Sequence, residues 1–348
     1  MVTQSLEHSI FPPDRKPVYT NWARTALEVA VELEGLRGST VMLPAFICQD
    51  SFLPLFERLD LTPRFVDVTL PTYHIDIEEA QEHIDAVDAV VVVHAFGLPV
   101  EMDQWVTLCD EHDCVLIEDC ARALGARIDG QPVGAYGDYA VYSLQKVAPV
   151  SKGGVVLLPD SEADVPLQRP TYGVGALYNA LPRGVREKLS VAYPLEIQPL
   201  SLDAITKRRF QRYAKRQYGD EMSVNIERAR KLREGLEPLG FEFQEERAGR
   251  IYPVAPAMVP CKRDALIHYL MSYHVPHKVA WGNPWTKTHV GATFAEQYPN
   301  TADLSDRIIQ FKVGAMDDDD VEFAIDRIRE FVVEFGVENR NEVRGEVK

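Results

Sequence analysis

An uninterrupted β-branched run places the strongest constraint on the fold of this chain. Residues 88–97 read DAVVVVHAFG, and the four consecutive valines leave no polar side chain for a solvated face. Strands of this kind are buried on both faces, as in a parallel sheet that helices cover on both sides. The run therefore predicts a central strand of an α/β domain.

Strand-like and helical patterns alternate around this run. Strand-like segments lie at 39–46, 62–68 and 114–120, and helical spacing of apolar residues lies at 20–37, 51–59, 75–84 and 101–113. Gly38 is expected to cap the first helix at its end, and Asp76 to cap the third at its start. The alternation predicts a large α/β domain with a mostly parallel central sheet flanked by helices. In such sheets, ligands bind at the carboxyl ends of the strands.

The pattern changes after residue 160. Residues 161–200 are rich in Pro, Gly and Tyr, and helices followed by short strands and helices begin near residue 201. We expect a large domain over 18–200, a smaller C-terminal α+β domain over 201–337 and a frayed tail over 338–348. The aspartates 317–320 begin the last helix, where acidic side chains favour the helix dipole, so this interpretation is preferred over a metal site.

Charge and composition exclude several classes of partner. The chain has 53 acidic and 37 basic residues, a formal charge of −16, which disfavours nucleic-acid binding. It contains neither an apolar run of about 18 residues nor a signal-peptide pattern, so we expect a cytoplasmic protein without a membrane partner. The five cysteines lack paired spacing and are interpreted as thiols rather than disulfides or zinc ligands. The basic segment 207–216 is expected to form intramolecular salt bridges rather than to bind a nucleotide diphosphate.

Two features suggest an anion-binding site and a buried carboxylate that needs a partner. Ala23, Arg24 and Thr25 open a helix, whose unpaired N–H groups and positive dipole end suit a phosphate. Asp119 ends a buried strand, where a carboxylate needs a hydrogen-bonding or cationic partner. A pyridinium N–H would serve, and so would Arg122. An ordinary helix start and a structural ion pair remain the alternatives.

Two further features suggest covalent chemistry near that carboxylate. Ser143 ends the strand-like segment DYAVYS, and its hydroxyl could bind a phosphate. Lys146 follows three residues later, and an amine held near a carboxylate-bound heteroaromatic ring can form a Schiff base. A turn serine and a solvated lysine are the alternative interpretations. The second lysine of the stretch, Lys152, is interpreted as a solvated turn residue.

The order of these motifs resembles the DegT/DnrJ/EryC1/StrS family. HAFGLPVEMD begins at residue 94, IEDCARALGA at 117 and GAYGDYAVYS at 134, and Gly153 and Gly154 follow Lys146 by seven and eight positions. The resemblance is clear over residues 18–160 and looser over 221–335. It implies pyridoxal 5′-phosphate (PLP) dependent aminotransferases of fold type I, most of which act on nucleotide-linked keto-sugars.

The resemblance also implies roles for single residues. Lys146 would bind PLP covalently, Asp119 would pair with the pyridinium nitrogen, and Ser143 would hold the phosphate together with the backbone of Ala23, Arg24 and Thr25. His94 would lie beside the cofactor, although a core histidine that orients its loop is an equal alternative. Several positions depart from the family. Ser143 stands three rather than five residues before Lys146, and the helix entry reads NWARTAL. Arg122 stands where the family usually has Gln or His near the cofactor's ring oxygen, and Cys48 replaces a ring-stacking aromatic, with Phe46 nearby.

The implied function is transfer of an amino group from an amino acid, expected to be glutamate, to a keto-sugar for glycan or cell-surface polysaccharide biosynthesis. The alternatives are sugar dehydration or other PLP chemistry, and a catalytically weak PLP-binding regulatory protein. Some relatives that dehydrate lack the lysine, so Lys146 favours transamination. Family members are homodimers with sites between subunits, and the segment 171–184 is the nearest candidate for a strap that reaches the partner's site.

Overall fold

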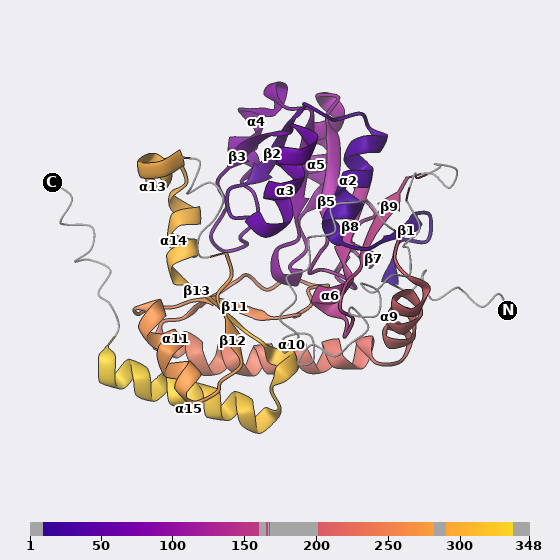
Figure 1. Cartoon of the computed structure of the whole chain (residues 1–348). Coiled ribbons are helices and arrows are strands. Elements are labelled where there is room, and N and C mark those ends of the chain that lie inside the picture. Colours follow the sequence, from indigo (N-terminus) through magenta and orange to yellow (C-terminus); the bar gives the residue numbers. More distant parts are fainter. Residues whose placement is uncertain (1–9, 160–164, 166, 168–200, 282–289, 337–348) are drawn as a thin grey trace.

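A seven-stranded sheet forms the centre of the larger part of the molecule (Figure 1). The computed structural model describes residues 10–159, 165, 167, 201–281 and 290–336, so the segment 171–184 and the tail 338–348 lie outside the described residues. The strands are β1 (Lys16–Thr20), β2 (Thr40–Pro44), β3 (Thr62–Val66), β4 (Ala89–Val93), β5 (Val115–Asp119), β8 (Tyr139–Ser143) and β9 (Gly154–Leu158), in the order β1-β9-β8-β5-β4-β2-β3. Strands β3, β2, β4, β5 and β8 run parallel, and β9 is antiparallel to both of its neighbours. The predicted mostly parallel sheet is confirmed.

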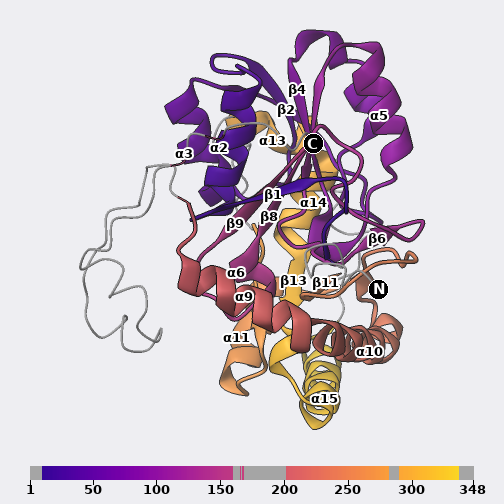
Figure 2. The same cartoon turned by 90° about the vertical axis from the view of Figure 1, so that its right-hand side faces the viewer.

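Strand β4 is buried on both faces, as its run of valines predicts. Ala89, Val91 and Val93 pack into one core with helices α2 (Ala23–Leu33) and α3 (Gln49–Leu59). Val90 and Val92 pack into another with α5 (Met102–Glu111). Figure 2 shows α2 and α3 on one side of the sheet and α5 on the other. Burying one such side chain stabilises the fold by about 1.5–3 kcal/mol. Helices on both faces of the sheet exclude water from the valines and so provide this stabilisation on each face.

Helices α2 and α4 are shorter than the patterns predict. Helix α2 ends at Leu33, before the predicted cap at Gly38. Helix α4 covers only Ile77–Gln81 and is followed by the 3-10 turn η1 (Ile84–Ala86). The predicted cap is correct, because the Asp76 carboxylate accepts hydrogen bonds from the backbone N–H groups of Glu78 and Glu79.

A second, antiparallel sheet has its own core. Its order is β10 (Glu242–Phe243), β11 (Ala255–Met258), β13 (Ile308–Phe311) and β12 (His277–Lys278). The accompanying helices are α9 (Ala204–Arg216), α10 (Tyr218–Leu236), α11 (Arg263–Ser272), α13 (Phe294–Gln297), α14 (Pro299–Arg307) and α15 (Asp318–Phe335). The start of α15 is a capping box in which Asp317 and Asp320 exchange hydrogen bonds with each other's backbone N–H groups, so these aspartates act at the helix start as predicted. No helix among the described residues has the length and apolarity needed to cross a membrane.

The two sheets meet through shared apolar and polar contacts. Phe46 and Phe96, which follow strands of the first sheet, share an apolar cluster with Met258 and Ile308 of the second. The Asp67 carboxylate, just beyond β3, caps α14 by accepting hydrogen bonds from the backbone N–H groups of Asn300 and Thr301 at 2.9 and 2.8 Å. These contacts hold the second sheet against the carboxyl ends of the parallel strands.

Two expectations from composition concern the five cysteines and the basic segment 207–216. The cysteines are free thiols: Cys48 is partly exposed, and Cys109, Cys114, Cys120 and Cys261 are buried. The salt bridges expected for segment 207–216, now on α9, stay a prediction: within the described residues its basic side chains form no ion pair within 4.0 Å. Lys207 instead lies over the ring of Tyr19, 4.0 Å from its centre. Most of the other basic side chains on this helix are exposed, where water stabilises their charge without a partner.

Candidate active site

A cavity opens where strands β4, β5 and β8 end. Its wall includes every predicted site residue except Thr25: Ala23, Arg24, Cys48, His94, Asp119, Arg122, Ser143 and Lys146. The location agrees with the prediction that ligands bind at the carboxyl ends of parallel strands. Thr25 is buried and lies outside the wall, because consecutive helical residues point in directions about 100° apart and cannot all face one cavity.

The start of helix α2 forms one side of the cavity. Its N-cap residue, Trp22, makes no side-chain capping bond, so the first-turn N–H groups of Ala23 and Arg24 have no side-chain acceptor at the cap. The Trp22 Nε1 atom is buried and has no hydrogen-bond partner among the described residues. The Arg24 guanidinium lies 5.1 Å from the centre of the Trp22 ring. The positive dipole end and the buried Trp22 Nε1 donor make this helix start suitable for a phosphate.

The glycine pair after Lys146 has two separate structural roles. A Cβ atom on Gly154 would lie 2.4 Å from the Trp22 carbonyl oxygen and 2.6 Å from the Ala23 backbone nitrogen. Only glycine therefore lets β9 approach the start of α2 this closely. Gly153 has φ of +133°, which disfavours other residues, and its carbonyl accepts a hydrogen bond from the Leu144 N–H at 2.9 Å.

The two lysines of the loop differ in position. Lys146 lies on the one-turn helix α6 (Leu144–Val147), directly after Ser143, and both residues line the cavity. Ser143 is 3% exposed, and its hydroxyl does not cap α6. Lys152 lies outside the lining, but its interpretation as a solvated turn residue is wrong: it is 8% exposed, and its Nζ atom lies 4.0 Å from the Asp203 carboxylate. A buried ammonium needs such a partner because its hydration is lost.

A buried hydrogen-bond network lies behind the cavity. The Glu118 carboxylate, which is 0% exposed, accepts hydrogen bonds from the backbone N–H groups of Gly134, Tyr136 and Gly137 at 2.7–2.8 Å and from His94 Nε2 at 3.0 Å. Burial alone would raise the pKa of Glu118, but the hydrogen bonds from His94 and the loop backbone lower it below its ordinary value. The network therefore holds a buried carboxylate in its charged form.

His94 belongs to this network through both ring nitrogens. Nδ1 accepts a hydrogen bond from the Val100 N–H at 3.0 Å, so Nε2 bears the proton that it donates to Glu118. His94 thus fixes its own loop, as the core-histidine alternative expects, while its ring also reaches the cavity wall. His94 can both orient its loop and lie at the cavity wall, because hydrogen bonds at both ring nitrogens fix the ring.

Asp119 is the next residue along β5 and faces the cavity. Its Oδ1 atom accepts a hydrogen bond from the Ala121 N–H at 2.8 Å. Burial raises the pKa of Asp119, although the Ala121 bond and the positive charges of Arg122 and Lys146 act in the opposite direction. A carboxylate in this state would be stabilised by a further proton donor, such as a ring N–H.

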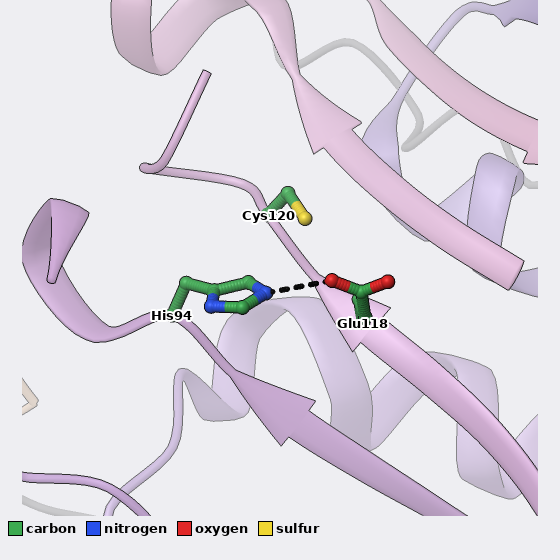
Figure 3. A group of neighbouring side chains, drawn as sticks. All are labelled: His94, Glu118 and Cys120. Carbon is green, nitrogen blue, oxygen red and sulfur yellow. Dashed lines mark hydrogen bonds and ion pairs between the residues drawn. The ribbon is translucent and has the colours of Figure 1, made fainter. Parts of the chain in front are cut away.

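His94, Glu118 and Cys120 also form a compact group of possible metal ligands (Figure 3). Their ligand atoms lie within 4.8 Å of one another, and all three side chains are buried. Figure 3 shows the His94 ring and the Glu118 carboxylate directed toward each other, with Cys120 beside them. Because Glu118 already accepts four hydrogen bonds, a cation there would have to displace donors that hold the fold. The chemistry of the group is that of a structural hydrogen-bond network.

Arg122 connects the two sheets at the cavity wall. Its Nη1 atom donates to the Oε1 atom of Gln310 on β13, and its guanidinium lies 5.4 Å from the Phe96 ring centre and 5.9 Å from that of Trp281. Phe96 and Trp281 stack with centroids 5.2 Å apart. Both adopt positive φ, 54° and 44°, which is rare for bulky residues and places strained backbone at this wall. Arg122 is thus oriented by a hydrogen bond and two aromatic faces.

The position expected to hold a stacking aromatic is occupied by Cys48, which lines the cavity and accepts a hydrogen bond from the Ser51 hydroxyl at 3.6 Å. Phe46 is outside the lining and packs edge-on against Trp281 at 5.0 Å. Aromatic surface in the wall comes instead from Trp22, Phe96 and Trp281. Phe96 lies in the motif HAFGLPVEMD and Trp22 in the predicted helical segment 20–37, but Trp281 is far along the chain and no local pattern marks it.

Comparison with known proteins supports this site. The model of the DegT/DnrJ/EryC1/StrS aminotransferase family matches residues 14–169. A UDP-N-acetyl-3-dehydro-α-D-glucosamine 3-aminotransferase from Acidithiobacillus ferrooxidans is 34% identical over 134 residues, 36% of this chain and 35% of the relative. A GDP-4-keto-6-deoxy-D-mannose 3-dehydratase from Yersinia pseudotuberculosis is 29% identical over 129 residues, 36% of this chain and 33% of the relative. The chain thus spans about a third of the length of these curated relatives.

Solved structures extend the similarity of the fold to most of the chain. A sugar aminotransferase from Micromonospora echinospora superposes with a TM-score of 0.69 and 21% identity, covering 91% of this chain and 87% of the other. The predicted fold class is therefore confirmed across both sheets. The match to the DegT/DnrJ/EryC1/StrS aminotransferase family covers residues 14–169, which contain nearly all the predicted site residues of the cavity.

Proposed function

We propose that this protein is a PLP-dependent aminotransferase that moves an amino group from an amino acid to a keto-sugar. Glutamate is the expected donor, and a nucleotide-linked sugar made for glycan or cell-surface polysaccharide biosynthesis is the expected acceptor. The observation that supports it most is the convergence of Lys146, Asp119, Ser143 and the start of α2 on one cavity. These groups come from separate elements, so their meeting reflects the tertiary fold. The match to an aminotransferase family over the same residues supports the same reaction class.

The residues of the cavity fit PLP in three respects. The buried carboxylate of Asp119 has a raised pKa and suits a protonated ring nitrogen. The start of α2, with the unpartnered Trp22 Nε1 beside it, offers donors to a phosphate. Lys146 supplies the primary amine that covalent attachment requires.

When bound, PLP supplies an electron sink that stabilises negative charge at the α-carbon of the amino donor. Asp119 keeps the ring nitrogen protonated, while Ser143 and the α2 backbone hold the phosphate. Lys146 takes the proton from the donor α-carbon and, in the second half-reaction, delivers a proton to the acceptor carbon that receives nitrogen. His94, locked by Glu118, positions the loop after β4 behind these groups.

A homodimer and a cytoplasmic location belong to the same proposal. The homodimer derives from the family resemblance, whereas the location is the one expected from the sequence pattern. Sedimentation equilibrium of the full chain tests the dimer, and a single species of one-chain mass would contradict it. Fractionation of cells that produce the protein tests its location.

The half-reaction with an amino donor tests the proposed function. The PLP-loaded protein is expected to be yellow. Addition of glutamate should bleach this colour and release 2-oxoglutarate. A loaded protein that is inert to every amino donor would favour the catalytically weak regulatory alternative. Release of a dehydrated sugar without nitrogen transfer would favour dehydration, the reaction named for the Yersinia relative.

A further inference from the structure

The side-chain amide of Gln244 ties two loops of the first sheet to the second sheet. Gln244 directly follows β10 and is 0% exposed. Its Nε2 atom donates hydrogen bonds to two backbone carbonyls, that of Ala95 at 3.0 Å and that of Thr72. These carbonyls belong to the loops that follow β4 and β3. One buried amide thus uses both of its N–H groups to bridge the two loops.

Arg250 fixes the orientation of this amide. Its side chain is buried, and its Nη2 atom donates a hydrogen bond to Oε1 of Gln244 at 2.7 Å. A guanidinium has donors only, so the amide oxygen faces Arg250 and the NH2 group faces the two loops. The Nη1 atom of Arg250 also donates to the backbone carbonyls of Gln244, at 3.1 Å, and Glu245. The amide is therefore held at both its oxygen and its nitrogen.

Each of the two carbonyls directly precedes an aromatic residue in the left-handed region of backbone conformation. Tyr73 has φ of +59°, and Phe96 has φ of +54°. Phe96 and Gly97 are the central residues of a tight turn, in which positions with positive φ usually hold Asn, Asp or Gly. The Leu98 N–H closes this turn by donating to the Ala95 carbonyl at 3.1 Å. A bulky residue keeps such a conformation only where its surroundings enforce it.

The conformation of Phe96 determines part of the cavity wall. The Phe96 ring stacks on Trp281 with centroids 5.2 Å apart and lies 5.4 Å from the Arg122 guanidinium. All three side chains line the cavity. The Tyr73 ring packs edge-on against Phe96 with centroids 6.3 Å apart, so the two strained residues also contact each other. Gln244 lies outside the cavity lining and therefore acts on the cavity through the turn that carries Phe96.

We propose that Gln244 is a positioning residue for this cavity: its amide holds Phe96 in the left-handed conformation and thereby fixes the wall formed by Phe96, Trp281 and Arg122. A wall that is already in place raises the affinity of a site, because few molecules must reorganise before a ligand binds. The effect on PLP rests on the proposed function, whereas the effect on the backbone of Phe96 rests on the hydrogen bonds alone.

Two substitutions separate the functions of the amide oxygen and the amide nitrogen. Gln244→Leu removes both. Gln244→Glu keeps an oxygen that accepts from Arg250, but an ionised glutamate offers no N–H to the two loop carbonyls. Gln104→Leu, at an exposed position on α5, is the matched control. Crystal structures of the full-length wild type and variants measure φ of Phe96, and far-UV circular dichroism checks that each protein is folded.

Phe96 is expected to leave the left-handed region in both Gln244 variants and to keep its φ near +54° in the control. The affinity for PLP in equilibrium dialysis should fall about tenfold or more in both variants, because the donors that hold the wall are lost. The visible circular dichroism of bound PLP should weaken as well. A residue that only stabilised the fold would lower the unfolding midpoint but leave the affinity and the dichroism of the folded protein unchanged.

Phe96 at its original φ in both variants would overturn the proposal, as would an affinity and a dichroism equal to those of the control. If Gln244→Leu does not fold, Gln244→Glu decides the question, because it keeps the bond to Arg250. A wild-type protein that never takes up PLP would remove the proposed function, while φ of Phe96 in the variants would still decide whether Gln244 positions it.

Discussion

Substitution of Glu118 by glutamine tests the buried network behind the cavity. The carboxylate accepts four hydrogen bonds, two at each oxygen: His94 and Gly134 at Oε2, and Tyr136 and Gly137 at Oε1. A glutamine retains one oxygen and presents an NH2 group, which cannot accept, to the other two donors. Each buried donor left unpaired costs about 1–3 kcal/mol, so Glu118→Gln should lower the free energy of unfolding by about 2–6 kcal/mol.

That loss is large relative to the stability of a typical protein, about 5–15 kcal/mol. Urea denaturation at pH 7, followed by circular dichroism, is the assay, and the transition midpoint of Glu118→Gln should fall clearly. Glu111→Gln, at an exposed position near the end of α5, is the matched control and should change stability by less than about 0.5 kcal/mol. If the two variants have the same midpoint, Glu118 is not the acceptor that holds this loop.

The stability difference between the wild type and Glu118→Gln should depend on pH. Hydrogen bonds lower the pKa of Glu118 in the folded protein, so its stabilisation is fully present above the pKa of the unfolded chain, about 4.3. The stabilisation is lost as pH falls through the lower, folded-state value. The stability difference between wild type and Glu118→Gln should therefore be largest near neutral pH and shrink in acid. A difference that grows on acidification would contradict the assigned charge state.

Three further predictions concern the cavity. Burial raises the pKa of Asp119, so protein without PLP should lose stability as pH rises from the ordinary carboxyl range to the raised value; Asp119→Asn should flatten this part of the stability curve and weaken PLP binding in equilibrium dialysis. Gly154→Ala should push its new Cβ against the Trp22 backbone, so the free energy of unfolding should fall by about 1–3 kcal/mol in thermal or urea unfolding and the affinity for PLP should fall too. The control Gly219→Ala has open space around its Cβ and should leave both the stability and the PLP affinity unchanged. Lys152→Met should lower stability but keep most turnover, and complete loss of turnover in a folded variant would refute its structural role.

Local patterns in the sequence predicted the elements whose causes are local. The valine run of β4 indicated burial on two faces, and Ala89 and Val90 do pack into different cores. The cap at Asp76 and the acidic start of the last helix at Asp317 depend on neighbours within three residues, so local sequence was enough to predict them. The end of α2 was misplaced because Gly35, with φ of +67°, ends the helix before Gly38, and the Leu36 N–H donates to the Val31 carbonyl at 2.9 Å.

Other features of the site depend on contacts between distant residues. The burial of Lys152 is set by Asp203, some 50 positions away, so the local turn pattern gave the wrong exposure. Trp281 lines the cavity and Gln310 reaches Arg122 only because the second sheet packs against the first, and no short motif marks either residue. The sequence therefore predicted the groups near the strand ends, while the second-sheet wall became visible only in the fold.

The site of cofactor attachment is the most direct test of the proposed function. The PLP-loaded protein is reduced with borohydride and digested, and the modified peptide is identified by mass spectrometry. We predict that the cofactor is recovered on Lys146, and that Lys146→Ala shows no modified peptide and no turnover while Lys152→Ala keeps both. Recovery of the cofactor on Lys152, or on no lysine at all, would contradict the account.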